Sequence, residues 1–228
     1  MSFFATITGA IGAAVNFVGG LVAKVGPAVS GFAKTIIQIA SKIDLPKIVQ
    51  IISDTAKIIH AVVDLLGIKS EDDPEVLGAK AEQSDKKMED FDNDVEAYIK
   101  YLKEEVQLDM KKFEQMNEDE KLGCKAVGLS LETKAVEQKI GGVHITPEFV
   151  GVISKIQEAG IAINGKDLLH IIQVLKNEGI TNLNDVVDYL KGKGNSDRIK
   201  TGEVLHTALG QGADKILNDL KNAVRKDL

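Results

Sequence analysis

Cysteine is nearly absent from this 228-residue sequence, in which Cys124 stands alone. A single cysteine rules out an intrachain disulfide framework. The four histidines, His60, His144, His170 and His206, lie far apart and have no cysteine neighbours, so the sequence gives no support to a zinc site. It also has no G-x-S-x-G element, catalytic carboxylate pair or calcium loop. We therefore expect no enzyme activity, no cofactor and no bound metal; an enzyme site built from scattered residues ranks last among the hypotheses.

Charge is missing from the beginning of the chain, where no Lys, Arg, Asp or Glu precedes Lys24. An apolar run of about 20 residues is long enough to cross a bilayer, but glycines, threonines and Asn16 dilute this one. No basic residue precedes the run and no clear cleavage site follows it, so we do not expect a secretory signal peptide. Residues 1–23 are a marginal candidate for a transmembrane helix.

An excess of positive charge is missing as well, because the formal net charge is −6 at pH 7. A net-negative chain gives no support to general binding of nucleic-acid phosphates, so no nucleic-acid partner is expected. Residues 1–69 carry six Lys and three Asp, whereas residues 70–140 carry 11 basic and 20 acidic residues. The acidic middle predicts either a surface for a protein partner or, more simply, solvated helix faces with charge pairs.

Small residues recur at helical spacing within the uncharged run. In a helix they lie on two stripes with a spacing of four, and Asn16 shares one of these stripes. Stripes of this kind allow a second helix to approach closely. The predicted helix-packing residues are Ala5, Gly9, Gly12, Ala13 and Gly20.

A second apolar segment follows Asp44 and Pro46, which suit the first turn of a helix that Gly67 would end. From Lys47 to Leu66, polar residues occupy one narrow stripe and nearly all other positions are Ile, Val, Leu or Ala. Such a helix is either central in a bundle or covered by a membrane or partner. Hydrophobicity alone does not separate these interpretations, so both stay open.

His60 borders the polar stripe of this segment. Its ionisation near neutral pH suggests a switch that controls entry into a membrane. The simpler interpretation is an ordinary, partly exposed histidine.

The apolar positions of residues 1–69 form a predicted membrane or assembly interface. Burial of apolar area is favourable at about 25 cal/mol per Å² whatever supplies the cover, so the sequence does not name the partner. The excess of Lys over Asp in this segment slightly favours contact with anionic headgroups. The predicted interface consists of Phe3, Phe4, Ile7, Ile11, Val15, Phe17, Val18, Leu21, Ile48, Ile51, Ile52, Ile58, Ile59, Val62, Leu65 and Leu66.

The whole sequence predicts an all-α fold in three parts, of which residues 1–69 are the first. Residues 75–140 are expected to form an acidic helical hairpin. Its first member is one long amphipathic helix that reaches about Met116, and its second begins at a capping box that starts at Asn117. Residues 144–228 are expected to form a cluster of short helices, each with its own cap and stop residues.

Residues 160–167 fit the first seven positions of the phosphate-binding loop G-x-x-x-x-G-K-[ST]. The hydroxyl that this loop needs is replaced by Asp167, whose carboxylate would repel phosphate. We interpret the segment as a helix that ends at Gly160 and a new one capped by Asn164.

Two functional hypotheses explain the apolar first third. The first is a non-enzymatic, membrane-active protein of pore-forming or membrane-penetrating type, such as a toxin, whose N-terminal helices insert into or associate with a lipid bilayer. The second is a structural subunit of a larger particle, such as a virion, phage or secretion apparatus, that buries the same helices against neighbouring copies. The first predicts membrane association, with secretion that uses no classical signal peptide; the second predicts a homo-oligomer in plain buffer.

Overall fold

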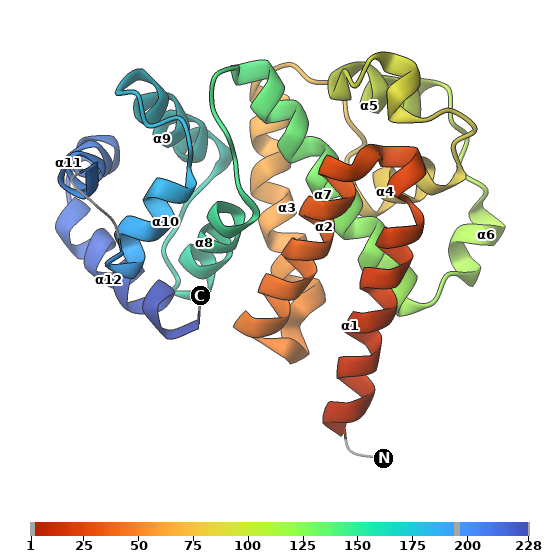
Figure 1. Cartoon of the computed structure of the whole chain (residues 1–228), viewed down its shortest axis with the longest axis horizontal. Coiled ribbons are helices and arrows are strands. Elements are labelled where there is room, and N and C mark those ends of the chain that lie inside the picture. The colour runs from red at the N-terminus through yellow and green to blue at the C-terminus, as the bar shows by residue number, and fades with distance from the viewer. Residues whose placement is uncertain (1–2, 194–196, 228) are drawn as a thin grey trace.

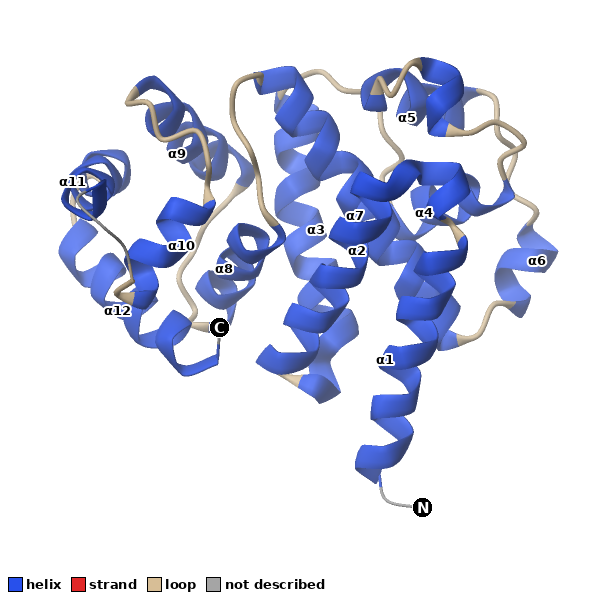
Figure 2. Ribbon diagram, in the orientation of Figure 1, coloured by secondary structure: helices blue, strands red, loops and turns tan. Residues whose placement is uncertain are grey.

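The computed structural model consists of helices joined by loops, as Figures 1 and 2 show. It describes residues 3–193 and 197–227, and the side chains of these except residues 3–8, 10, 45, 197–198 and 226–227. No strand occurs in these ranges, so the predicted all-α class is confirmed. The α-helices are α1 (Phe3–Gly20), α2 (Val22–Ile43), α3 (Ile48–Leu65), α4 (Pro74–Gln83), α5 (Val95–Glu104), α6 (Met110–Gln115), α7 (Glu118–Ile140), α8 (Pro147–Glu158), α9 (Gly165–Asn177), α10 (Asn184–Lys191), α11 (Asp197–Leu209) and α12 (Ala213–Asp227).

Helix α7 is the centre of the first 140 residues, because α1, α2, α3, α4 and α5 all pack against it. Its buried side chains include the polar residues Ser130, Glu132 and Thr133. The hydroxyl groups of Ser130 and Thr133 donate to the carbonyl oxygens of Ala126, at 2.6 Å, and Leu129, at 2.7 Å. These hydroxyls therefore enter the core with their hydrogen bonds made inside the helix.

Helix α4 crosses α7 at very short range because glycines stand at the crossing points. A Cβ atom on Gly78 would lie 1.9 Å from the carbonyl oxygen of Cys124. A Cβ atom on Gly128 would lie 1.9 Å from the carbonyl oxygen of Pro74. The backbones of α4 and α7 thus touch directly, and neither glycine position has room for a side chain.

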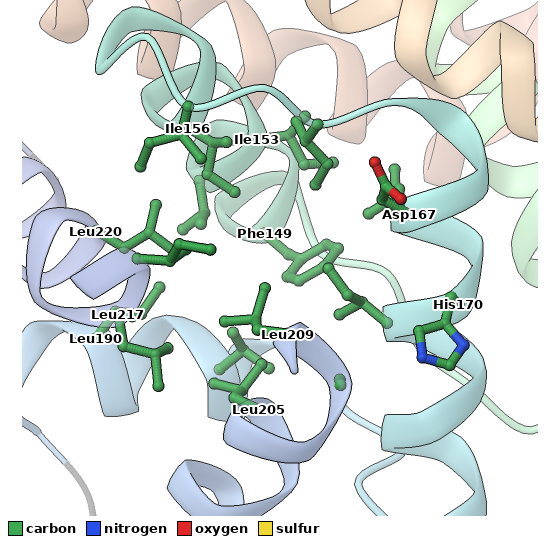
Figure 3. A pocket seen from close by; sticks show the side chains of 18 of the residues that line it. Phe149, Ile153, Ile156, Asp167, His170, Leu190, Leu205, Leu209, Leu217 and Leu220 are labelled. Atoms are coloured by element: carbon green, nitrogen blue, oxygen red, sulfur yellow. The ribbon is translucent and has the colours of Figure 1, made fainter. Parts of the chain in front are cut away.

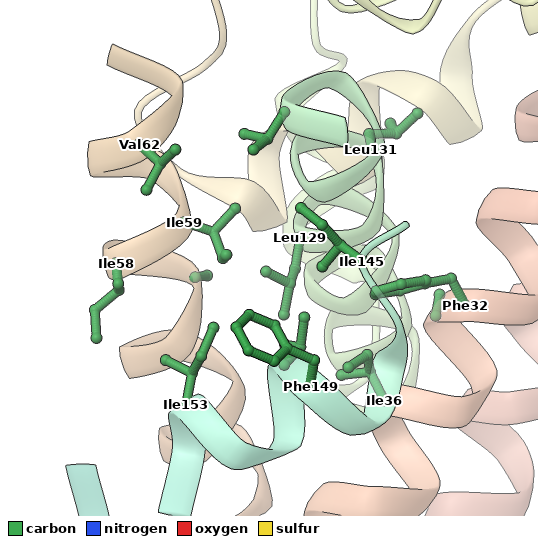
Figure 4. Packing of buried hydrophobic residues seen from close by; sticks show 14 of the residues in the cluster. Phe32, Ile36, Ile58, Ile59, Val62, Leu129, Leu131, Ile145, Phe149 and Ile153 are labelled. Atoms are coloured by element: carbon green, nitrogen blue, oxygen red, sulfur yellow. The ribbon is translucent and has the colours of Figure 1, made fainter. Parts of the chain in front are cut away.

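Helices α8 to α12 form a second group beside α2 and α3 (Figure 1). Helix α8 packs against both α2 and α3, and α9 packs against α3, where Gly165 faces the backbone of Ala61 and Val62. Figure 4 shows the junction: Phe32 of α2, Ile59 of α3 and Phe149 of α8 point toward one another and toward α7. One continuous apolar core therefore joins the two groups.

The predicted long helix from residue 75 to about residue 116 is wrong. This stretch contains α4, a 3-10 turn at Met88–Phe91, α5 and α6 instead. The chain leaves α4 through Ser84, which is extended, and Asp92 and Asn93 have φ angles of 55° and 59°, which a helix cannot contain. The middle segment is therefore not a two-helix hairpin.

The breaks in this stretch coincide with carboxylate caps. Asp94 accepts a hydrogen bond from the backbone N–H of Ala97 and so begins α5. Asp109 accepts hydrogen bonds from the N–H groups of Lys111 and Lys112 and begins α6. Each cap satisfies amide groups that a helix start leaves unpaired, which favours several short helices over one long helix.

Two other predicted helix starts and one predicted helix end agree with the structure, whereas Asp44 does not cap α3, which begins after Lys47. The capping box at Asn117 opens α7, and Asn164 with Asp167 forms the capping box of α9. The glycine at 160 has a φ angle of 71°, the left-handed conformation expected after a helix C-terminus. Residues 160–167 are thus a helix end followed by a new helix start, as predicted.

Candidate functional site

Helix α1 packs one side against the core and leaves the other open. Ala14 and Val18 have no exposed surface, and the ring of Phe17 lies against Gly123 of α7. The hydroxyl of Ser30 in α2 donates to the carbonyl oxygen of Val18 at 3.0 Å, within the core. The second half of α1 is therefore held by α2 and α7.

The predicted helix-packing residues of α1 lie on its open side where the structure describes them. Gly9, Gly12 and Gly20 would meet no atom within 4 Å if they carried a Cβ atom. Ala13 and Asn16 are exposed as well, whereas the side chain of Ala5 lies outside the described residues. The structure thus turns the described members of both predicted stripes away from the core, and no helix within residues 3–193 and 197–227 covers them.

The first turns of α1 extend beyond the rest of the molecule, past the beginning of α7 and the turn between α2 and α3 (Figure 1). That turn lies at the same end because α1, α2 and α3 run alternately up and down. It exposes Lys42, Pro46, Lys47 and Val49, which is 43% exposed. An uncharged helix end and two exposed lysines therefore share one end of the protein.

The predicted interface residues divide into three groups. The side chains of Phe3, Phe4 and Ile7 lie outside the described residues. Those that the chain itself buries are Val18, Leu21, Ile48, Ile51, Ile52, Ile58, Ile59 and Val62. Those that keep some exposure are Ile11, Val15, Phe17, Leu66 and, at 54%, Leu65.

Helix α3 is therefore a core helix in this structure, with its predicted polar stripe at the surface. Lys57 of α3 and Lys47, which precedes the helix, are exposed, and the buried side of α3 faces α7, α2, α8 and α9. A bilayer or partner would reach Ile51 or Ile59 only after α3 had left this site. The accessible part of the predicted interface is α1.

A buried hydrogen bond between a histidine and a carboxyl group joins α3 to α7. The Nδ1 atom of His60 lies 2.7 Å from the Oε1 atom of Glu132, a carboxylate whose side chain has no exposed surface. This hydrogen bond raises the pKa of His60, against the opposing effect of burial, while burial raises the pKa of Glu132. The Oε2 atom of Glu132 and the hydroxyl of Ser70 are buried without a hydrogen-bond partner among the described residues.

Sequence reasoning missed Glu132 because it lies in a charged, apparently amphipathic helix. Its neighbours Ser130 and Thr133 are also polar, so this part of α7 resembles a solvent face. A usable signal was the glycines at 123 and 128, since a helix that is apolar or small around most of its circumference is central.

Other candidate groups provide no site. Cys124 is fully buried on α7, and burial raises the pKa of its thiol far above the usual range. Within residues 3–193 and 197–227, no three His, Cys, Asp or Glu side chains converge to hold a metal ion. The same part of the chain contains no helix whose length and hydropathy would let it cross a bilayer.

Comparisons with known proteins identify no relative: no family model, no curated protein and no solved structure matches this chain. The projecting, uncharged end of α1 and the adjoining turn are the surface that the geometry of the described residues singles out.

Proposed function

We propose that this is a non-enzymatic, membrane-active protein that attaches to a lipid bilayer through the projecting end of α1. The observation that carries the proposal is the uncharged beginning of α1, which extends past α7 at the same end of the molecule as Lys42 and Lys47. Association through α1 leaves the core of α2, α3 and α7 in place.

Two effects favour this attachment. An apolar helix end is stabilised when its surface leaves water, at about 25 cal/mol per Å². Exposed lysines beside it add about 1 kcal/mol each near an anionic leaflet, an attraction that salt weakens. The Nζ atom of Lys47 lies 2.8 Å from the carboxylate of Asp44, which offsets part of this charge. We therefore expect binding that combines apolar insertion with a modest preference for anionic lipid.

Flotation with neutral and with anionic vesicles tests the proposal. The test variant is Gly12→Glu, which places a charge on the open side of α1 where no atom lies within 4 Å of the added Cβ. A charged side chain costs about 2.5–3.5 kcal/mol at the centre of a bilayer, so we expect the floating fraction to fall by about tenfold or more.

The matched control is Gln173→Glu, the same gain of charge at an exposed position of α9. Full-length protein and Gln173→Glu should float equally, and best with anionic vesicles at low salt. If the unaltered protein stays at the bottom of the gradient with both vesicle types, the proposal is wrong. If Gly12→Glu floats as well as the unaltered protein, α1 is not part of the surface that binds the bilayer.

Penetration of the bilayer, as in a pore-forming toxin, is a stronger form of the same proposal. It requires α1 to leave Gly123 and the core contacts of Val18, so it predicts release of an entrapped dye. A disulfide that ties α1 to α2 would then abolish dye release but not flotation. We suggest cysteine pairs at positions 18 and 30, whose main chain and side chain already meet at 3.0 Å, in a Cys124→Ala background.

A second candidate function, assembly into a larger particle such as a virion or secretion apparatus, is favoured by the open glycines of α1. Gly9, Gly12 and Gly20 leave room for the backbone of a helix from another copy. This function predicts a discrete oligomer by light scattering without lipid. Gly12→Leu should then convert the oligomer to monomer, while a chain that is monomeric from the start excludes it.

A further inference from the structure

A cavity of about 190 Å³ lies among α8, α9, α10, α11 and α12, and it is partly open to solvent. Figure 3 shows Phe149, Ile153, Leu205 and Leu217 pointing into this space from three different helices. Asp167 and His170, both on α9, are the only polar residues among the described residues that line it. The interior is thus apolar, and its polar groups are confined to one helix at the edge.

The wall of this cavity offers little to a polar occupant. In the described part of the chain, none of the side chains that line the cavity is a buried polar group without a hydrogen-bond partner. One carboxylate oxygen of Asp167 already accepts a hydrogen bond from the backbone N–H of Asn164, at 3.2 Å. A buried water needs two to four polar partners, whereas apolar cavities stay dry and bind apolar molecules.

The size of the cavity sets an upper limit on its occupant. An engineered apolar cavity of about 150 Å³ in another protein accepts benzene. The space here is slightly larger, so it holds one ring or one short alkyl chain and excludes most of a two-chain lipid.

The charge at the edge decides between neutral and anionic occupants. Of the residues that the structure describes, the lining includes the carboxylate of Asp167 but no Lys or Arg. A carboxylate headgroup at the opening would be repelled by Asp167, at a cost of about 1–4 kcal/mol for charges about 4 Å apart. We infer that this cavity binds one small, uncharged, apolar molecule, with any hydroxyl group that the molecule carries placed beside Asp167 and His170.

The test compares 1-octanol with octanoate, which share a chain length and differ in charge. Binding to the full-length protein is followed by NMR of labelled Ile, Leu and Val methyl groups. We expect 1-octanol to shift the methyl signals of Ile153, Leu205 and Leu217 saturably. We expect octanoate to bind more weakly than 1-octanol by a factor of about ten or more.

Two variants separate the cavity from the rest of the surface. Ala208→Phe adds a ring to the lining of the cavity and should abolish octanol binding. Ala97→Phe, at a half-buried position of α5, is the control and should bind octanol unchanged. Absence of octanol binding to the unaltered protein, or equal binding to Ala208→Phe, overturns the inference.

The charge assignment has its own variant, which keeps the test decisive if Ala208→Phe fails to fold. Asp167→Asn leaves the apolar lining intact and should bring the affinity for octanoate to within a few-fold of that for 1-octanol. If octanoate binds the unaltered protein as tightly as 1-octanol, or if Asp167→Asn leaves the discrimination unchanged, the assignment of an uncharged ligand is wrong.

Discussion

The imidazole Nδ1 of His60 lies 2.7 Å from the Oε1 atom of Glu132, and the pair joins α3 to the central helix. The carboxylate group is fully buried, whereas the His60 side chain is 18% exposed. Carboxylates of Asp64, at 3.8 Å from Nε2, and of Asp72 act on the same ring. All three acidic groups favour the protonated form of His60.

The stability of the protein should therefore decline on the alkaline side of neutrality. Because the pKa of His60 is raised above 6.5 in the folded chain, its stabilising effect is complete below that pH and is lost as the pH rises through the folded value. The raised pKa of Glu132 acts in the same direction, since the folded chain then binds both protons more tightly than the unfolded chain. Urea unfolding from about pH 6 to pH 9 measures the effect.

His60→Gln is the control for this pH dependence. The difference in unfolding free energy between the unaltered protein and His60→Gln should be largest near pH 6 and shrink toward pH 9. A difference that widens as the pH rises would show that the stabilisation by His60 increases with pH, which contradicts the prediction. The direction also bears on the switch hypothesis, because acidification strengthens this contact between α3 and α7 instead of releasing it.

Removing the His60 side chain should lower the free energy of unfolding more than neutralising Glu132 does. His60→Ala leaves a buried carboxylate without its partner, and breaking such a pair costs about 3 kcal/mol or more. Glu132→Gln keeps the shape and a hydrogen-bonding group while removing the buried charge, so we expect a loss of under about 1 kcal/mol. Chemical denaturation at neutral pH measures both, and equal losses would mean that burial of the charge has little cost here.

Alanine at Gly78 or Gly128 should destabilise the fold. Each added methyl group would meet a carbonyl oxygen at 1.9 Å, so α4 and α7 must separate, with an expected loss of about 3 kcal/mol. Gly12→Ala is the matched control: no atom lies within 4 Å of the added methyl group, and alanine favours a helix by about 1 kcal/mol. Thermal unfolding of the three variants measures these effects. Equal unfolding temperatures for Gly78→Ala and Gly12→Ala would refute the close crossing.

The thiol of Cys124 should be unreactive until the protein unfolds. It has no exposed surface, and burial raises its pKa so that almost no thiolate forms near neutral pH. Labelling of Cys124 with a disulfide reagent should be slow for the folded protein in buffer. It should be complete within the mixing time for the protein unfolded in guanidinium. Fast labelling of the folded protein would show that α4 and α7 separate readily.

Local signals predicted helix starts and stops well, because they depend on a few neighbouring residues. Asn117 and Asn164 begin helices in the structure, and Gly160 adopts the left-handed conformation that follows a helix C-terminus. The prediction of one long helix was wrong because it followed the spacing of apolar residues and overlooked the capping residues. Asp94 and Asp109 are caps, yet in the sequence they resemble surface charges within a regular pattern.

The candidate site was harder to predict than the fold class. Hydrophobicity singled out Ile51 and Ile59 together with α1, but it does not show which apolar positions the chain buries by itself. The decisive contacts, such as Phe17 on Gly123 and Phe149 beside α3, join residues far apart in sequence. The apolar cavity has the same origin, since five separate helices supply its lining.

The crossing of α4 and α7 also provides a way to recognise related chains. The crossing depends on direct backbone contact at two points, and neither point has room for a side chain larger than that of glycine. A distant sequence that places glycine at the positions equivalent to 78 and 128, each within a helical pattern, would be a candidate for common descent even where overall identity has faded.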